Sequence, residues 1–229
     1  MNSSRKIAVI TGVVFIIATV TALIAAMLVP VLTGTDYLNR VSANTNQVAA
    51  GAFFYLIAAF TSVGVAISLY PVLKKINSGL ALGAVVFRTL DAVFYMVAVM
   101  SLLSLLSLGQ QVTKTGIDNR LSLYAIGDSL VSIRDHATLL GVFAFCVGAF
   151  IYYYMFYQSR LIPGWLSGWG IVAILLMMTA CVSSLFSDSS VTGYVLLVLP
   201  IAVQEMVLAI WLIVKGFSPS SNILQQTKS

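Results

Sequence analysis

Eight polar or ionisable residues lie inside stretches of the sequence that are otherwise apolar. They are Arg88, Asp91, Tyr95, Arg134, Asp135, His136, Gln204 and Glu205. Arginine and carboxylate side chains can form ion pairs or hold polar ligands, and a histidine can change charge near neutral pH. Such groups on apolar segments predict either a polar binding site or a network that joins the segments. We call these eight residues the polar set.

The elements that carry the polar set must suit an apolar environment. The chain has 229 residues, of which 60% are hydrophobic and 8% are charged, and its mean hydropathy is +1.02. Soluble domains contain about 25% charged residues. The composition therefore predicts a multi-pass membrane protein.

Six segments are long enough to cross a bilayer, which takes about 20 mainly apolar residues. They cover about residues 7–32, 47–73, 78–108, 125–157, 164–186 and 191–215. We therefore predict an all-α integral membrane protein in which residues 1–217 form a single domain, a bundle of six transmembrane helices. The first segment is too long for the apolar part of a secretory signal and is expected to be retained. The polar residues 218–229 are predicted to form a disordered cytoplasmic tail.

Basic residues predict the orientation, because Lys and Arg accumulate in cytoplasmic loops. If the N-terminus is inside, the cytoplasmic set is Arg5, Lys6, Lys74, Lys75, Arg160, Lys215 and Lys228, and the outer set is Arg40, Lys114 and Arg120. Both termini are therefore predicted to be cytoplasmic. Trp165, Trp169 and Trp211 fall near the same helix ends, as expected for rings at a membrane interface.

Several kinds of site are disfavoured. The sequence pI near 9.3 follows from the topology, and no basic patch on an exposed face suggests a nucleic-acid partner. Cys146 and Cys181 fall within predicted helices, so we expect free apolar thiols. A zinc enzyme needs several convergent ligands, and the chain has a single histidine. We predict no metal and no cofactor.

Helix geometry places members of the polar set at similar depth. Arg88 and Asp91 are three residues apart and share a face with Tyr95. At 1.5 Å per residue, Arg88 lies about 20 Å and Glu205 about 15 Å above the cytoplasmic boundary, so we predict a direct Arg88–Glu205 pair. Arg134 lies nearer the outer rim and is expected to lean toward Asp91. Pairing is expected because an isolated charge in the membrane costs about 2.5–3.5 kcal/mol or more.

Three further patterns concern the helices themselves. Pro200 removes an amide donor one turn before Gln204 and predicts a bend. The stretch RLSLYAIGDSLVSIRDH, residues 120–136, predicts an interfacial helix or an outward extension of the fourth span. Small residues recur on two faces, which predicts close helix packing. These faces are Arg134, Thr138, Gly141, Phe145, Gly148 and Tyr152 on the fourth span, and Gly51, Tyr55, Ala58, Ser62 and Ala66 on the second.

Five segments together resemble a family of bacterial multi-pass membrane proteins known as domain of unknown function 4386. They are LYPVLKK (69–75), FRTLDAVFY (87–95), IRDHATLLG (133–141), YYYMFYQSRLIPGWLSGWG (152–170) and LPIAVQEMVLAIWLIVKGF (199–217). The similarity runs from about Arg5 to Phe217. The resemblance implies a helical bundle in a bacterial cytoplasmic (inner) membrane. It supplies no reaction, substrate or catalytic residue.

Three hypotheses follow for function. In the first, the polar set lines an outward-open cavity that binds or transports a small amphiphile or lipid. In the second, the charges are a structural lock that holds the helices in register within a structural or regulatory subunit, whose protein partners are unknown. In the third, the protein is an intramembrane hydrolase, for which no GxSxG or nucleophile–base pattern is found. We therefore predict a non-enzymatic role with membrane lipids as partners and no catalytic residue.

Overall fold

The computed structural model describes residues 3–114, 120–187 and 190–218. Within these ranges the fold is all helical and contains no strand. The elements are α1 (Ser3–Leu28), α2 (Tyr37–Ala43), α3 (Thr45–Leu73), α4 (Ser78–Val112), α5 (Arg120–Ser159), α6 (Gly164–Leu185), the 3₁₀ turn η2 (Val191–Gly193) and α7 (Val195–Val214). Six of them are long and apolar enough to cross a membrane, so the predicted fold class and the six spans are confirmed.

The helix boundaries differ from the predicted ones where the chain leaves the apolar segments. The region between the first two predicted spans contains the short helix α2. The fourth span begins at Arg120, so of the two alternatives for residues 120–136 the extension of this helix is present and a separate interfacial helix is not. At 1.5 Å per residue, α5 is about 60 Å long, roughly twice the hydrocarbon thickness, so one or both of its ends project from the membrane. The predicted tail lies mostly in residues 219–229, outside the described residues.

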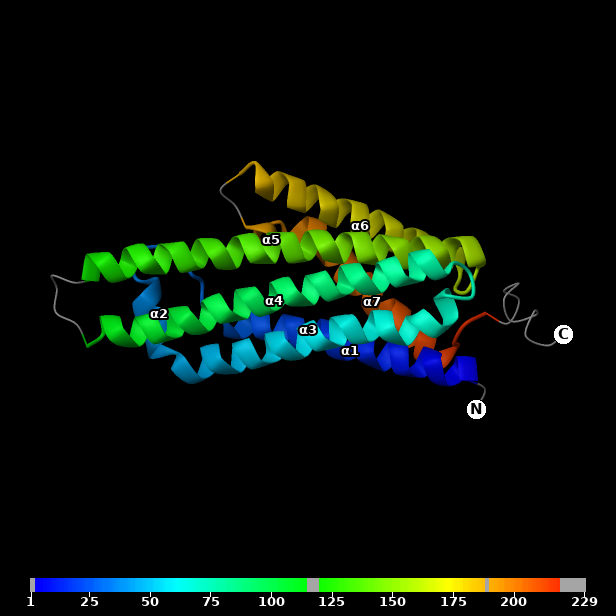
Figure 1. Cartoon of the computed structure of the whole chain (residues 1–229), viewed down its shortest axis with the longest axis horizontal. Coiled ribbons are helices and arrows are strands. Elements are labelled where there is room, and N and C mark those ends of the chain that lie inside the picture. The colour runs from blue at the N-terminus through cyan, green and yellow to red at the C-terminus, as the bar shows by residue number, and fades with distance from the viewer. Residues whose placement is uncertain (1–2, 115–119, 188–189, 219–229) are drawn as a thin grey trace.

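The six long helices form a closed ring. Each packs against the next long helix along the chain, and α7 packs back against α1. Figure 1 shows α4 and α5 side by side along most of their length, with α1 and the C-terminal part of α7 meeting at one end. The large apolar side chains on the outside of the ring are exposed, as expected for a surface that faces lipid tails.

The two ends of the bundle are held by different contacts. At the end where α1 begins and α7 ends, which we call the terminal end, Arg5 donates hydrogen bonds to Leu212 O (3.2 Å) and Ile213 O (2.5 Å), carbonyls at the C-terminus of α7. At the opposite end, which we call the α2 end, the Tyr37 hydroxyl donates to Asp128 Oδ1 (2.9 Å) and so joins α2 to α5. Burial and the neighbouring Asp128 carboxylate raise the pKa of the Tyr37 phenol. The side of the membrane that each end faces stays a prediction.

Candidate functional site

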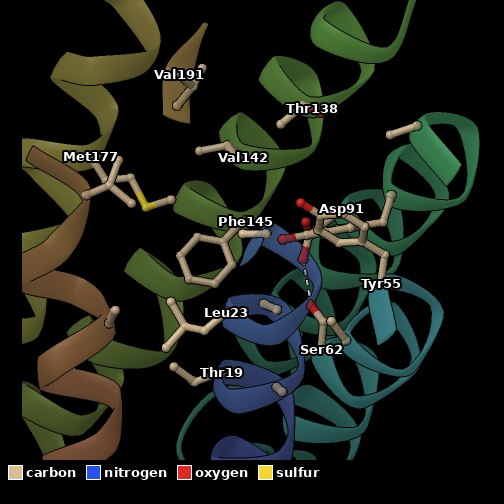
Figure 2. A pocket seen from close by; sticks show the side chains of 18 of the residues that line it. Thr19, Leu23, Tyr55, Ser62, Asp91, Thr138, Val142, Phe145, Met177 and Val191 are labelled. Carbon is tan, nitrogen blue, oxygen red and sulfur yellow. Dashed lines mark hydrogen bonds between the residues drawn. The ribbon is translucent and has the colours of Figure 1, made fainter. Parts of the chain in front are cut away.

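A cavity of about 270 Å³ lies inside the ring, and all six long helices contribute to its wall (Figure 2). Its apolar lining comes from small and branched side chains, among them Ala22, Ala98 and Val142, and from the Met177 thioether. The polar lining is Thr19, Tyr55, Ser62, Arg88, Asp91, Tyr95, Arg134, Asp135, Thr138, Ser190 and Glu205. The lining is mainly apolar with a few convergent polar groups, a combination that is typical of ligand pockets in proteins.

The most deeply buried charges lie together in this cavity. Arg88, Asp91 and Glu205 are 2%, 1% and 8% exposed. We call these three residues the charged floor of the cavity. The cavity also has more exposed lining residues, since Leu23 and Ser190 are exposed and the Asp135 side chain is 41% exposed. It therefore extends from the charged floor to the protein surface.

Asp91 is held by two neighbouring groups. The Ser62 hydroxyl of α3 donates a hydrogen bond to Asp91 Oδ2 (2.6 Å), which Figure 2 marks. Arg88 Nη1 lies 3.8 Å from the same oxygen. The Arg88 Nε donates to Ser62 O at 3.4 Å, so arginine, acid and serine form one cluster between α3 and α4.

The predicted direct pair between Arg88 and Glu205 is wrong. The described residues contain two ion pairs, Arg88–Asp91 and Arg134–Asp135. Arg88 turns along its own helix because the Asp91 carboxylate, three residues away, is within reach. The Phe145 ring stabilises the guanidinium in this position, since its centre lies 4.3 Å from the guanidinium carbon. Glu205 instead accepts a hydrogen bond from the Thr19 hydroxyl of α1 (3.3 Å). Both Arg88 and Glu205 line the cavity and interact electrostatically, although they do not touch.

The expected contact between Arg134 and Asp91 is also replaced by a more local one. Arg134 Nη1 lies 3.3 Å from Asp135 Oδ1, the next residue on α5. Its side chain is 20% exposed and lies near the Tyr55 hydroxyl. The Tyr55 and Tyr95 rings are in contact, with centroids 5.9 Å apart. Arg134 and Asp135 thus form a neutral pair on the cavity wall, in a more exposed part than the charged floor.

Two members of the predicted polar set do not line the cavity. His136 is exposed, and its Nδ1 lies 2.7 Å from Ser132 O on the same helix. Gln204 is buried, accepts a hydrogen bond from the Tyr153 hydroxyl, and donates one to Leu166 O (3.1 Å). Gln204 therefore connects α5, α6 and α7, whereas the neighbouring Glu205 faces the cavity.

The close approach predicted from the small-residue face of α5 is present. A Cβ built on Gly148 would lie 3.2 Å from Arg88 Cγ, and one built on Gly141 would lie 3.2 Å from Phe94 Cβ. Such contacts leave no room for a larger side chain. The glycines thus bring α5 close enough for Phe145 to cover the Arg88 guanidinium.

Some cavity residues were not assigned to a site from the sequence. The sequence placed Ser62 and Tyr55 on the small-residue face of the second span, which was predicted to pack against another helix. Both residues line the cavity instead of only contacting a neighbouring helix. Thr19 had no distinguishing pattern, since hydroxyl residues are common in membrane helices and usually bond to their own backbone. The convergence of α1 with α7 that brings Thr19 to Glu205 is a tertiary contact.

Several buried polar atoms of the cavity lack a hydrogen-bond partner. They are Asp91 Oδ1, Glu205 Oε1 and Arg88 Nη1. Leaving a buried polar atom unpaired costs about 1–3 kcal/mol, and more for a charged group. A hydrogen-bond partner that reached these atoms, from water or from another molecule, would therefore lower the free energy of the site.

The described residues contain no cluster of three or more His, Cys, Asp or Glu side chains that could hold a metal ion. Cys146 and Cys181 are free and buried, as predicted, and their thiols interact across the α5–α6 contact.

Comparisons with known proteins identify the sequence family. A family model described as "Domain of unknown function (DUF4386)" matches residues 10–216, which is most of the chain. No curated protein and no solved structure was found to match the chain.

Proposed function

The chain belongs to the DUF4386 family of unknown function, and we propose that it is a membrane protein that binds or transports a small amphiphile or lipid in its central cavity. The observation that carries this proposal is the combination of apolar walls with a charged floor whose polar atoms are incompletely paired. An amphiphile matches both the apolar wall and the charged floor. Its tail can pack against the alanine and leucine side chains, and its head group can form hydrogen bonds with the polar atoms of the floor.

The volume of the cavity limits the size of the ligand. Pockets for drug-sized molecules measure about 300–1,000 Å³, and the volume here is about 270 Å³. A complete two-chain phospholipid is larger than this space. The proposed ligand is therefore a compact amphiphile, or one chain and the head group of a lipid that remains partly in the bilayer.

We also propose that the protein lies in a bacterial cytoplasmic (inner) membrane with both termini in the cytoplasm. The basic residues Arg5, Lys74, Lys75, Arg160 and Lys215 all lie at or near helix ends of the terminal end of the bundle. Such a concentration of Lys and Arg at one end is typical of a cytoplasmic side. The cavity then extends from the charged floor toward the outer leaflet.

The structural lock remains the second candidate, because a specific contact favours it. The Ser62–Asp91 hydrogen bond and the covering of Arg88 by Phe145 join α3, α4 and α5. A lock alone would be expected to pair its charges fully, because each unpaired buried charge weakens the fold. The incomplete pairing of Glu205 therefore favours ligand binding over a purely structural role.

Native mass spectrometry of the protein extracted with its lipids tests the proposal. The decisive variant is Ala98→Phe, because a phenylalanine at this lining position would fill part of the cavity without changing a charge. Ala49→Phe is the matched control, since Ala49 is exposed on α3 and does not line the cavity. We expect a discrete bound molecule in the wild type and in Ala49→Phe that is lost in Ala98→Phe. Equal occupancy in all three folded proteins, or no bound molecule in any of them, would contradict the proposal.

A further inference from the structure

The charged floor carries one positive and two negative groups. With Arg88, Asp91 and Glu205 all ionised, its net charge is minus one. The pair Arg134–Asp135 is neutral as a unit and adds nothing to this balance. An unpaired charge inside the hydrocarbon is among the most costly features of a membrane protein, so we expect the floor to be balanced by a proton on one of the acids or by a bound cation.

The excess negative charge lies on the Glu205 side of the cavity. Asp91 already has Arg88 Nη1 at 3.8 Å and the Ser62 hydroxyl at 2.6 Å. Glu205 accepts a hydrogen bond from the Thr19 hydroxyl at 3.3 Å, lies near the buried Tyr152 hydroxyl and interacts with Arg88 at longer range, but takes part in neither of the ion pairs of the described residues. A cation in the cavity would therefore be drawn toward Glu205.

The atoms left unpaired also indicate the chemistry of the missing group. Asp91 Oδ1 and Glu205 Oε1 are carboxylate oxygens, which accept hydrogen bonds when ionised, and both are buried without a partner. An ammonium group carries one positive charge and three N–H donors, so it has donors enough for both carboxylates. The Tyr55 and Tyr95 rings line the same cavity, and aromatic rings attract cations placed over their faces.

An anionic head group fits the floor poorly. Arg88 Nη1 is also without a hydrogen-bond partner, and it is the group that would attract an anion. Its guanidinium, however, lies against Phe145 and next to the Asp91 carboxylate. A carboxylate or phosphate placed there would meet the repulsion of two acids, and like charges at close range destabilise a buried site.

We propose that the cavity is selective for amphiphiles with a primary ammonium head group, which binds between the Asp91 and Glu205 carboxylates with its apolar tail along the alanine-rich wall. This inference rests on the proposed binding function and specifies its ligand class. In the ligand-free protein a proton can supply the missing positive charge, and the ammonium group takes its place on binding.

A head-group series on the wild-type protein tests this inference. The probes are octylamine, octanol and octanoate, which share one chain length and differ in charge. Full-length protein in nanodiscs of zwitterionic lipid is titrated by calorimetry at neutral pH, and the signal of empty nanodiscs is subtracted. We expect saturable binding of one octylamine per protein, about tenfold or more tighter than octanol, which corresponds to one charge-assisted interaction. Octanoate is expected to bind weakest.

Two charge variants locate the effect. Glu205→Gln keeps the shape of the side chain and removes its charge, and we expect it to weaken octylamine binding about tenfold with little change for octanol. Asp36→Asn is the matched control, because the Asp36 side chain is exposed at the start of α2 and does not line the cavity. The ranking of head groups uses the wild type alone, so it remains decisive even if Glu205→Gln does not fold.

The outcomes separate this inference from the proposed function. Saturable octanol or octanoate binding that equals or exceeds octylamine binding overturns the ammonium selectivity and leaves the amphiphile site standing. No saturable binding of any of the three overturns the inference, and a bound molecule in native mass spectrometry then still supports the proposed function.

Discussion

At the residue scale, the ionisable groups of the cavity find partners according to reach and local geometry. Arg88 pairs with Asp91 on its own helix rather than with Glu205 on α7, although both acids line the same space. Ser62 adds a hydrogen bond from α3 to Asp91 Oδ2. Each acid thus has one oxygen bonded by a hydroxyl, Ser62 for Asp91 and Thr19 for Glu205, and one buried oxygen without a hydrogen-bond partner, and Asp91 alone also has an arginine in its ion pair.

We expect Ser62→Ala to destabilise the protein by about 1–3 kcal/mol, since it removes the hydroxyl that bonds Asp91 Oδ2 and leaves a second buried carboxylate oxygen without a hydrogen-bond donor. The free energy of unfolding in mixed detergent micelles measures this effect. Ser104→Ala is the control, because Ser104 is exposed and bonds only to Met100 O of its own helix. Equal stabilities of the two variants would contradict the assigned role of Ser62.

The Arg88–Asp91 pair predicts strong coupling in a double-mutant cycle. Arg88→Met should destabilise the protein by about 3–5 kcal/mol because it leaves the Asp91 carboxylate buried without its cation. Adding Asp91→Asn removes that isolated charge and should recover part of the loss, with a coupling of about 1–3 kcal/mol. Unfolding measured for the four proteins of the cycle checks this, and additive effects would mean that the two side chains act independently.

At the scale of elements, the contact between α4 and α5 is built on glycine. A Cβ on Gly148 would lie 3.3 Å from Arg88 N and 3.2 Å from Phe87 Cβ, so the backbones meet with little room between them. This contact sets the distance between the Arg88 guanidinium and the Phe145 ring. The register of two helices therefore controls the shape of the charged floor.

Gly148→Leu should force α4 and α5 apart and destabilise the protein by about 1–3 kcal/mol or more, the range found for overpacked interiors. Gly168→Leu on α6 is the matched control, since nothing lies within 4 Å of a Cβ at that position. Thermal unfolding of both variants in the same detergent makes the comparison. We also expect Gly148→Leu to lower octylamine binding, because Arg88 and Phe145 would shift. A stable Gly148→Leu protein with unchanged binding would disprove the tight contact.

At the scale of the whole molecule, the ring closes because α7 returns to α1. Arg5 bonds the C-terminal carbonyls of α7, and a Cβ on Gly12 would lie 2.6 Å from Ala209 O on the same helix. Closure places Thr19 beside Glu205 and encloses the cavity. The first and last helices of the chain, α1 and α7, thus form one wall of the cavity together.

The predicted topology is tested by labelling single cysteines in intact bacterial cells after both native cysteines are replaced by alanine. Ser3→Cys and Lys75→Cys lie at the terminal end, and Asn39→Cys and Thr113→Cys lie at the α2 end. A membrane-impermeant maleimide should label only the α2-end pair, because basic residues concentrate at the other end. Labelling of the terminal-end pair instead would reverse the orientation.

The sequence alone determined the all-helical membrane class, the six spans, and which residues carry charge at membrane depth. These properties depend on local composition, because about 20 consecutive apolar residues already satisfy the bilayer and a helix satisfies its own backbone. The tight glycine face of α5 was also predictable, since residues three and four apart share a helix face. Only the tertiary structure decided that Arg88 pairs with Asp91, that Glu205 meets Thr19, and that Gln204 and His136 lie outside the cavity wall. Depth along a helix limits which side chains could meet, but the rotation and lateral order of the helices in the ring decide which ones do.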